Sequence, residues 1–433
     1  MEKTFKICVG NRGFCLYNTK IYDTIRIVRG AMDYKVSEYY INHGFRSRDV
    51  EKAKLYEMVV ADGETSRKRL NERLHLRPNN VSEAVQQLID EKLIVENSNV
   101  KPEGRGRPEV MLMPNPNRFV VITVWVLAGK MMADLVNMGG TILWKDTESI
   151  PENYGNEEFL DSVIRVLTKA KAHVSAEQTL LGIGISMPGG MNWDNMKWSF
   201  NSRFGGIVDL DFSGLSSLFG VPVRLIRLVD SQLKALNIMN SEASACSVLM
   251  IHWGYGVGAS FSLNGEIPKS LRGSVFGIGH VKVDRTEAAR LCDCGERGCL
   301  EAFCGGRALG PEVVRILGRS LGRDDEVWSE VIASCKLWES EPFRVAIEHL
   351  SNVLDNMVRI IFPDKIVIYG PFLRNAWVRE TLLDSVRRKI PKYARPLVEI
   401  SVLEGSLEER VSVGCTFDFF RNRLIEMLVF KSE

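Results

Sequence analysis

The stretch CDCGERGCLE, residues 292–301, gathers three cysteines into a short segment of a 433-residue chain. Cys292, Cys294 and Cys299 follow a C-x-C-x4-C spacing, and the two intervening glycines allow a tight loop. Zinc prefers four tetrahedral nitrogen or sulfur ligands, so three thiolates need one more partner. The spacing therefore predicts a structural zinc site whose fourth ligand lies elsewhere in the sequence.

The first candidate for that fourth ligand is His280 in GIGHVKVD, with His252 and Cys304 as weaker alternatives. A closed set of three cysteines and one histidine leaves no open position for an activated water, so no zinc-based hydrolysis is expected. The alternative is that the cysteines only pack in a core, as free cysteines often do. Three thiols this close, flanked by glycines and near a histidine, favour zinc.

Bulk composition excludes several classes of protein. Hydrophobic content of 45% with 25% charged residues indicates a folded chain, and its length suggests two or three domains. The 56 Lys and Arg nearly cancel the 54 Asp and Glu, so net charge does not indicate whether a nucleic acid is bound. No apolar run approaches the roughly 20 residues of a membrane span, and the N-terminus is a poor signal peptide. We therefore expect no membrane insertion, a cytoplasmic location and nine reduced cysteines.

Residues 49–114 have the pattern of a winged helix-turn-helix, whereas residues 1–48 suggest no role. Helical spacing is found in DVEKAKLYEMVVADG, in TSRKRLNERLHL with Thr65 and Ser66 as possible N-caps, and in RPNNVSEAVQQLIDEKLI after a turn at Pro78. Two short apolar runs around the tip GRGRP then predict a β-hairpin. Three helices followed by a hairpin are typical of a DNA-binding domain.

The third predicted helix carries a polar face that suits base edges in a major groove. The expected DNA contacts are Arg77, Asn79, Asn80, Ser82, Glu83 and Gln86, with Arg105 and Arg107 at the hairpin tip reaching a minor groove. The alternative is a small interaction module with an ordinary solvated face. The basic tip favours DNA, because phosphate contacts supply most of the affinity.

From residue 118 to residue 425 strands and helices alternate, which predicts a two-lobed α/β unit. Within it, Gly279-His280 followed by Cys292 to Glu301 resembles the zinc signature of the ROK family, named for repressors, open reading frames and sugar kinases. The resemblance covers about residues 50–420, and GRGRPEVMLMPNP resembles the linker of the repressor branch. It implies a fold class of α/β type: an N-terminal winged helix-turn-helix plus a two-lobed, actin-like, ribonuclease-H-like sugar-kinase domain. It also implies dimers or tetramers.

The resemblance further implies a lost nucleotide site. Family kinases carry D-x-G-x-T on the first strand, where this chain reads Trp125 to Gly129 with aspartate, glycine and threonine all replaced. The second phosphate loop, G-T-G-x-G, is here Gly254 to Gly258 without the threonine, and the Gly-Gly after the late strand is Gly370-Pro371. Phosphoryl transfer needs a phosphate cradle. The chain is therefore expected not to use ATP and not to be an enzyme.

The sugar side is partly retained. The family's N-D-A-N motif, which supplies the catalytic base, keeps only Asp230, and the glutamate before I-G-H is replaced by Gly277. The resemblance implies ligand contacts at Asn201, Asp230, His280 and Glu301. On its own, Asp230 after an apolar strand also fits a helix N-cap. The aromatic residues Trp193, Trp198 and Phe200 fit either stacking on a sugar or loop packing.

These features predict a transcriptional regulator, most simply a repressor of carbohydrate uptake or metabolism genes. A homodimer or tetramer would bind a pseudo-palindromic operator, a sugar-like effector would bind between the lobes, and zinc would be structural. Two alternatives stay open: an active ROK sugar kinase that phosphorylates a hexose, and a regulator controlled by a protein partner.

Overall fold

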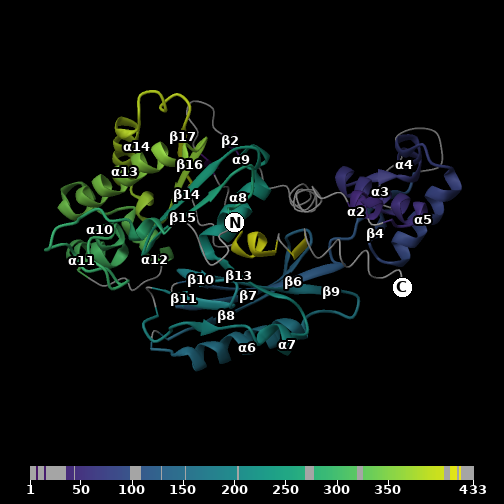
Figure 1. Ribbon diagram of the computed structural model, residues 1–433, viewed down its shortest axis with the longest axis horizontal. Coiled ribbons are helices and arrows are strands. Elements are labelled where there is room, and N and C mark those ends of the chain that lie inside the picture. The colour runs from purple at the N-terminus through teal and green to yellow at the C-terminus, as the bar shows by residue number, and fades with distance from the viewer. Residues whose placement is uncertain are drawn as a thin grey trace.

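The computed structural model describes residues 6–7, 14–15, 36–42, 44–97, 109–127, 129–151, 153–201, 204–268, 277–318, 325–403, 410–416 and 419–420. Within these ranges, every helix is too short or too polar to span a bilayer. A helical unit stands at one end of the molecule, beside a two-part body in which one sheet lies below the other (Figure 1). The fold is mixed α/β, as the sequence predicts.

The helical unit consists of α3 (Ser47–Asp62), α4 (Arg67–Leu74) and α5 (Pro78–Asp90), with α2 (Val36–Asn42) packed on α3. A small sheet in the order β3-β5-β4 completes it, from β3 (Thr65–Ser66), β4 (Ile94–Asn97) and β5 (Met111–Pro114). The three predicted helices are confirmed, and β4 pairs antiparallel with β5 as the predicted hairpin requires. Ser66 is the N-cap of α4, where its side chain accepts a hydrogen bond from the Arg69 N–H at 3.3 Å.

The predicted turn at Pro78 is wrong, because Pro78 is the first residue of α5 and Arg77 is its N-cap. Proline suits this position, since its fixed φ fits a helix and its missing N–H would have had no partner inside the first turn. One face of α5 is apolar, with Val81, Val85 and Leu88 buried. The sequence therefore placed the helix correctly and misjudged only its start.

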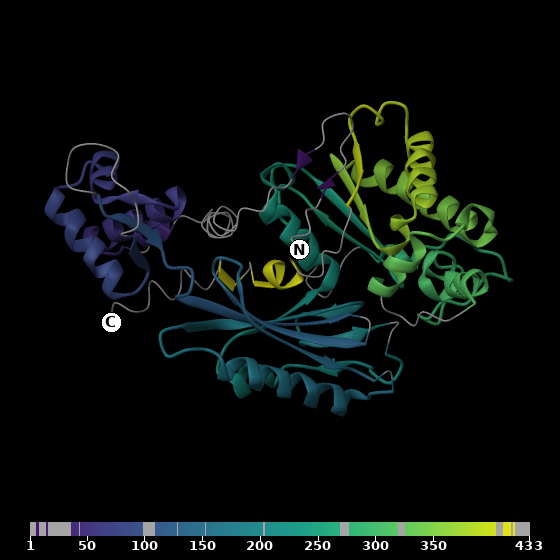
Figure 2. The same cartoon turned by 180° about the vertical axis from the view of Figure 1, so that it is seen from behind.

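The first lobe of the body is a five-stranded sheet in the order β13-β9-β6-β7-β8. Its strands are β6 (Phe119–Leu127), β7 (Lys130–Asn137), β8 (Ile142–Ser149), β9 (Thr179–Met187) and β13 (Val223–Arg227). The β6–β7–β8 pairs are antiparallel, whereas β6, β9 and β13 run parallel. Helices α6 (Asn156–Ala172) and α7 (Leu215–Phe219) cover one face (Figures 1 and 2). All nine residues of β6 are buried, as expected of a central strand covered on both faces.

A three-stranded sheet, β10 (Gly190–Asn192), β11 (Lys197–Phe200) and β12 (Leu210–Asp211), extends the first lobe, and α8 (Leu228–Met239) and α9 (Ser241–Ser244) lead to the second. The second lobe is built on a sheet in the order β15-β14-β16-β17. Its strands are β14 (Val248–Trp253), β15 (Val257–Ser262), β16 (Lys365–Tyr369) and β17 (Glu399–Val402). Its helices are α10 (Glu301–Cys304), α11 (Gly306–Leu317), α12 (Asp325–Ile332), α13 (Glu341–Ile361) and α14 (Ala376–Lys389). Two two-residue strands, β1 (Lys6–Ile7) and β2 (Phe14–Cys15), pair near the N-terminus.

The helical unit and the first lobe share one hydrophobic core. Phe419 and Phe420, near the C-terminus, are fully buried in a cluster that includes Leu55 and Val85 of the helical unit and Leu181 of β9. Gly182 makes room for them, because a Cβ there would overlap the ring of Phe419. Phe419 and Phe420 are therefore part of the contact between the unit and the body.

Candidate functional site

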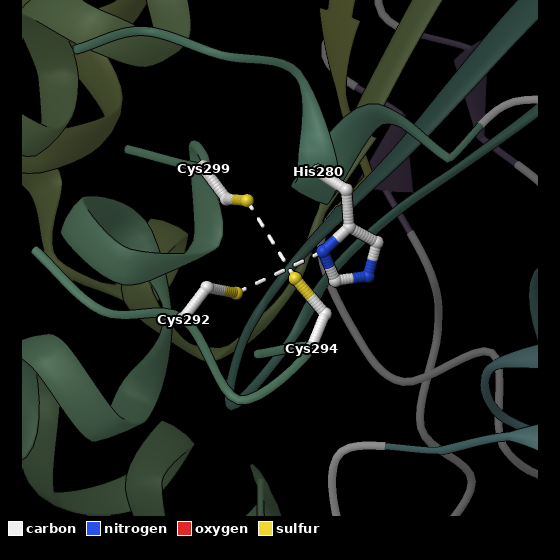
Figure 3. Close-up of side chains that lie close together, drawn as sticks. All are labelled: His280, Cys292, Cys294 and Cys299. Carbon is white, nitrogen blue, oxygen red and sulfur yellow. Dashed lines mark hydrogen bonds between the residues drawn. The ribbon is translucent and has the colours of Figure 1, made fainter. Parts of the chain in front are cut away.

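The candidate metal-binding loop, which comprises His280 and residues 292–299, is assembled from two segments of the second lobe. His280 ends a short 3-10 helix (Ile278–His280), and the cysteine loop returns to it through a bridge between Lys282 and Cys299. His280 Nδ1 lies 3.8 Å from Cys292 Sγ, and Cys294 Sγ lies 3.7 Å from Cys299 Sγ (Figure 3). All four ligand atoms lie within 4.8 Å of one another.

These distances fit a tetrahedral metal ion. Zinc–sulfur bonds of about 2.3 Å at tetrahedral angles give ligand-to-ligand edges of roughly 3.8 Å. The backbone permits the arrangement because Gly295 and Gly298 have φ of 86° and 76°, and a Cβ at Gly298 would overlap the Asp284 carbonyl oxygen. The four residues could therefore hold a metal ion.

The alternatives for the fourth ligand lie elsewhere. Cys304 is buried in α10 and donates to the Ala346 carbonyl at 3.2 Å, and the His252 ring packs 5.0 Å from that of Tyr369. Neither belongs to the group of four ligand atoms. His280 is the histidine that the structure brings to the cysteines.

The surroundings of the three thiols act on their charge in opposite directions. Burial raises the pKa of the Cys292 thiol to about 12; the neighbouring Cys294 and Cys299 sulfur atoms add to the rise, and a hydrogen bond from the Cys294 backbone opposes it. Three adjoining sulfur atoms would repel one another as thiolates, and a divalent cation removes that repulsion. Lys282 adds one positive charge, donating to Cys299 Sγ at 3.5 Å and to the Arg297 carbonyl at 2.7 Å.

His280 also faces the first lobe. Its Nε2 points away from the cysteines (Figure 3), and the Phe200 ring of β11 packs edge-on against the imidazole at 5.3 Å. Glu301 begins α10 and accepts a hydrogen bond from the Val257 N–H at 2.8 Å. A Cβ at Gly279 would lie 3.2 Å from Glu301 Oε2, so glycine lets the segment before His280 approach that carboxylate. The metal-binding loop thus positions both predicted ligand contacts.

Asp230 is held in a buried ion pair. Arg227 donates to both carboxylate oxygens, at 2.9 Å from Nε and 2.5 Å from Nη2, and Ser260 Oγ donates at 2.6 Å. The interpretation of Asp230 as an N-cap is wrong, because Arg227 is the N-cap and Asp230 lies inside the first turn of α8. A carboxylate with a bidentate arginine partner is held in one orientation. A ligand could reach it only by sharing or replacing these bonds.

Two other predicted side chains are also engaged within the protein. Asn201 accepts a hydrogen bond from the Phe204 N–H at 2.6 Å and donates to the Ile207 carbonyl at 3.3 Å. Trp198 is fully buried and donates to the Pro188 carbonyl at 2.8 Å, so stacking of Trp198 on a sugar is excluded. Trp193 packs against the same core. Of the three aromatic residues, only Phe200 lies beside His280.

The segment around Trp125, which the sequence aligns with the D-x-G-x-T motif of family kinases, belongs to a hydrophobic cluster. The cluster consists of Trp125, Leu127, Leu228 and Val411, with Met132 packed against it. The Trp125 indole donates to Asp134 at 2.9 Å, and Ser412 donates to the same carboxylate. Burial raises the pKa of Asp134, and these hydrogen bonds oppose that rise only in part.

The predicted DNA contacts on α5 share one solvent-exposed face. Exposed side chains there are Arg77, Asn79, Asn80, Ser82, Glu83 and Gln86. Glu83 pairs with Arg48 of α3, and Gln86 donates to Asp90 at 2.9 Å. The other predicted contacts, Arg105 and Arg107, lie outside the described residues.

Comparison with known proteins places this geometry in a family. The model of the ROK family matches residues 125–412, more than half of the chain. The chain belongs to the ROK family. A putative xylose repressor from Caldicellulosiruptor sp. (strain Rt8B.4) is 25% identical over 397 residues, which cover 85% of this chain and 94% of the relative.

Two solved ROK structures show the same fold. A ROK family transcriptional regulator, described as a homolog of the E. coli MLC protein, superposes with a TM-score of 0.66 at 18% identity and covers 88% of this chain and 98% of its own. A ROK glucokinase from Streptomyces griseus, in complex with glucose and AMPPNP, superposes with a TM-score of 0.56 at 19% identity. The superposition covers 68% of this chain and 97% of the glucokinase chain. The body of this chain therefore has the kinase-type fold of ROK proteins.

Sequence reasoning missed several residues of this ROK site. Arg227 lies three residues before Asp230 and could have been suspected from that spacing, since a strand end leads directly into α8. Ser260 and Ser412 could not have been suspected in this way. Ser260 meets Asp230, and Ser412 meets Asp134, only because distant segments of the chain pack together. Buried carboxylates need such donors.

Proposed function

We propose that this chain is a DNA-binding transcriptional repressor of carbohydrate uptake or metabolism genes, controlled by a sugar or related small ligand. In this proposal residues 49–114 form a winged helix-turn-helix, residues 118–425 form the ligand-binding and dimerisation domain, and residues 1–48 are an extension without an assigned role. The repressor works in the cytoplasm as a homodimer or tetramer on a pseudo-palindromic operator.

The observation that carries the proposal is the exposed polar face of α5. Its apolar face is fixed against α3, so the opposite face is presented rigidly to solvent. A helix of 13 residues with amide and hydroxyl groups along its first turns can enter a major groove and reach base edges. The name of the xylose-repressor relative, which aligns over most of the chain, supports the same role.

The proposed effector site lies beside the metal-binding loop. We propose that His280, Cys292, Cys294 and Cys299 hold a structural zinc ion, which would fix the orientation of the imidazole and of the segment before Glu301. Ligand contacts are assigned to His280 and Glu301. Asp230 and Asn201 contribute where the ligand replaces their present hydrogen bonds.

The same geometry supports a regulator without kinase activity. Bulky side chains around Trp125 fill the place where nucleotide phosphates need backbone N–H groups and glycines. Arg227 and Ser260 donate to the Asp230 oxygens that would have to accept a sugar hydroxyl proton. Two separate features therefore oppose phosphoryl transfer.

Selection of duplexes from a random DNA library with the full-length protein tests the function. We expect a pseudo-palindromic site, bound at least tenfold less tightly by a double variant Asn79→Ala/Asn80→Ala, since each base contact contributes about 1–3 kcal/mol. The matched control is Asn352→Ala on the exposed face of α13, which should bind like the unchanged protein. Failure of the unchanged protein to enrich any duplex would reject the proposal.

The alternatives predict other outcomes. Turnover of ATP with magnesium and any hexose would establish an active kinase and contradict our interpretation of Trp125. A regulator controlled by a protein partner would keep its operator affinity and its melting temperature across a panel of sugars. A sugar that raises the melting temperature and changes operator affinity supports the proposed effector.

A further inference from the structure

The connection between the helical unit and the body is hydrogen-bonded along its length. It consists of residues 115–118, between β5 and β6. The Asn115 N–H donates to the Leu93 carbonyl at 2.9 Å, and Asn117 Oδ1 accepts from Asn137 Nδ2 at 2.7 Å. A flexible tether would leave its polar groups to water. This connection instead behaves as a joint with defined partners on both sides.

Arg118 is the centre of that joint. Its Nε donates to the Glu91 carbonyl at 3.2 Å, at the C-terminal end of α5, where an arginine also complements the helix dipole. Its Nη1 donates to the Glu177 carbonyl at 3.1 Å and to Thr179 Oγ1 at 2.6 Å, at the start of β9. The Arg118 carbonyl accepts the Thr179 N–H at 2.9 Å. One side chain thus joins the last turn of α5 to a central strand of the first sheet.

The surroundings of Arg118 hold the same two elements together. Lys92 follows α5 in a left-handed conformation, with φ of 58°, and its Nζ lies 2.6 Å from Glu177 Oε1. That ion pair is exposed and contributes little by itself. Beneath it, Leu88 of α5 is buried in the same cluster as Phe119 of β6 and Leu181 of β9. The apolar contact opposes separation of α5 from β9, and the directional hydrogen bonds of Arg118 fix the angle between these two elements.

We propose that Arg118 is a positioning residue that locks α5 to β9, so that the helical unit and the first lobe move as one rigid body. The inference rests on the proposed DNA-binding function and adds a property to it. Effector-driven changes would then act through the relation between lobes or subunits, and the repressor would accept only a narrow range of half-site spacings.

The narrow range of half-site spacings follows from DNA geometry. B-DNA turns once in about 10–10.5 base pairs, or 34–36 Å. Two inserted base pairs therefore move the second half-site by about 7 Å and rotate it by roughly 70°. If α5 is held rigidly to the first lobe, it cannot follow the displaced half-site. If that connection is loosened, α5 can follow it.

The test measures affinity of the full-length protein for selected operators whose half-sites are moved apart by zero to four base pairs. We expect the unchanged protein to lose at least about tenfold in affinity on insertion of two base pairs, as one half-site loses its base contacts. Arg118→Ala should reduce that loss to about threefold or less, with unchanged affinity for an isolated half-site. Arg118→Lys, which keeps the charge but not the fork of donors, should be intermediate.

The matched control is Arg395→Ala. Arg395 likewise donates to carbonyls at the end of a helix, to Ile390 at 3.3 Å and Arg388 at 2.6 Å, but belongs to the second lobe. Its spacing profile should equal that of the unchanged protein. If Arg118→Ala does not fold, Thr179→Val removes one partner of the joint and should broaden the profile to a smaller extent.

Hydrogen exchange, measured by mass spectrometry without DNA, separates this inference from the proposed function. Amides at residues 93–97 and 179–181 should exchange faster in Arg118→Ala and not in Arg395→Ala. A spacing profile of Arg118→Ala that superposes on that of the unchanged protein would overturn the inference while DNA binding stands. So would a flat profile of the unchanged protein. If no duplex is bound at all, the proposed function fails, and unchanged exchange at the joint would then reject the inference independently.

Discussion

Replacement of one metal ligand, Cys294→Ser, is the most direct test of the metal centre. Cys294 Sγ lies 3.7 Å from Cys299 Sγ and within 4.8 Å of the other two candidate ligand atoms, so in the proposed zinc site it would supply one corner of the tetrahedron. A serine hydroxyl is far less acidic than a thiol and binds zinc poorly at neutral pH. The variant should therefore keep the fold of the loop but weaken metal binding.

The expected magnitude follows from the four-ligand geometry. Structural zinc sites contribute roughly 10–16 kcal/mol of apparent binding free energy at pH 7, or about 2.5–4 kcal/mol per ligand if shared equally. A loss of that size weakens metal affinity by roughly 70-fold to 1,000-fold. For a domain of about 300 residues, whose unfolding entropy is roughly 0.65 kcal/mol/K, this loss lowers the melting temperature by about 4–6 °C.

The assay is zinc content per chain by mass spectrometry after dialysis against a chelator, together with a thermal melt. Cys304→Ser is the matched control, because Cys304 is buried nearby but donates to the Ala346 carbonyl and lies outside the ligand set. We expect one zinc per chain in the unchanged protein and in the control, and far less in Cys294→Ser. Full zinc occupancy in Cys294→Ser, or its loss in Cys304→Ser, would refute the assigned ligands.

Three further predictions test the DNA contacts, a buried carboxylate and the shared core. The double variant Arg105→Ala/Arg107→Ala should weaken operator binding for all sequences. The slope of log affinity against log salt concentration should also become shallower by about 2, since each phosphate contact contributes about 0.9. In the same titration at several salt concentrations, Arg388→Ala on the exposed face of α14 should change neither the affinity nor the slope. Burial raises the pKa of Asp134 in the folded state, so its stabilising contribution is present at acid pH and is lost as pH rises through that pKa. The Asp134→Asn side chain cannot ionise, so the melting temperature of this variant should rise relative to that of the unchanged protein between about pH 4 and pH 7. A constant difference between the two melting temperatures across that range would contradict a raised pKa for Asp134. Phe420→Ala should destabilise the fully buried contact between the helical unit and the body by about 3–5 kcal/mol, measured by denaturant unfolding, and an effect below about 1 kcal/mol would remove Phe420 from that core.

Part of the site could be predicted from the sequence because its signals are local. The spacing of Cys292, Cys294 and Cys299 already requires a tight loop, and a zinc ion there would need one more ligand; the structure brings His280 to the three cysteines. The apolar and polar faces of α5 also follow from the helical repeat alone. Misjudged details, such as the start of α5 at Pro78, concern ends of elements, where neighbouring signals compete.

Side chains engaged by distant partners could not be predicted. The bond of Asp230 with Ser260 depends on how α8 packs against β15, and the burial of Trp198 depends on the whole first-lobe core. Periodicity describes which face a residue occupies, but it carries no information about which other element will cover that face.

The sequence by itself determined the metal-binding loop, the exposed face of α5 and the alternation of strands and helices, because each depends on residues a few positions apart. Only the tertiary structure decided that Phe419 and Phe420 close the core beneath the helical unit and that Arg118 joins α5 to β9. Contacts of that kind form between segments far apart along the chain, and they are selected by the packing and hydrogen-bonding of the complete fold.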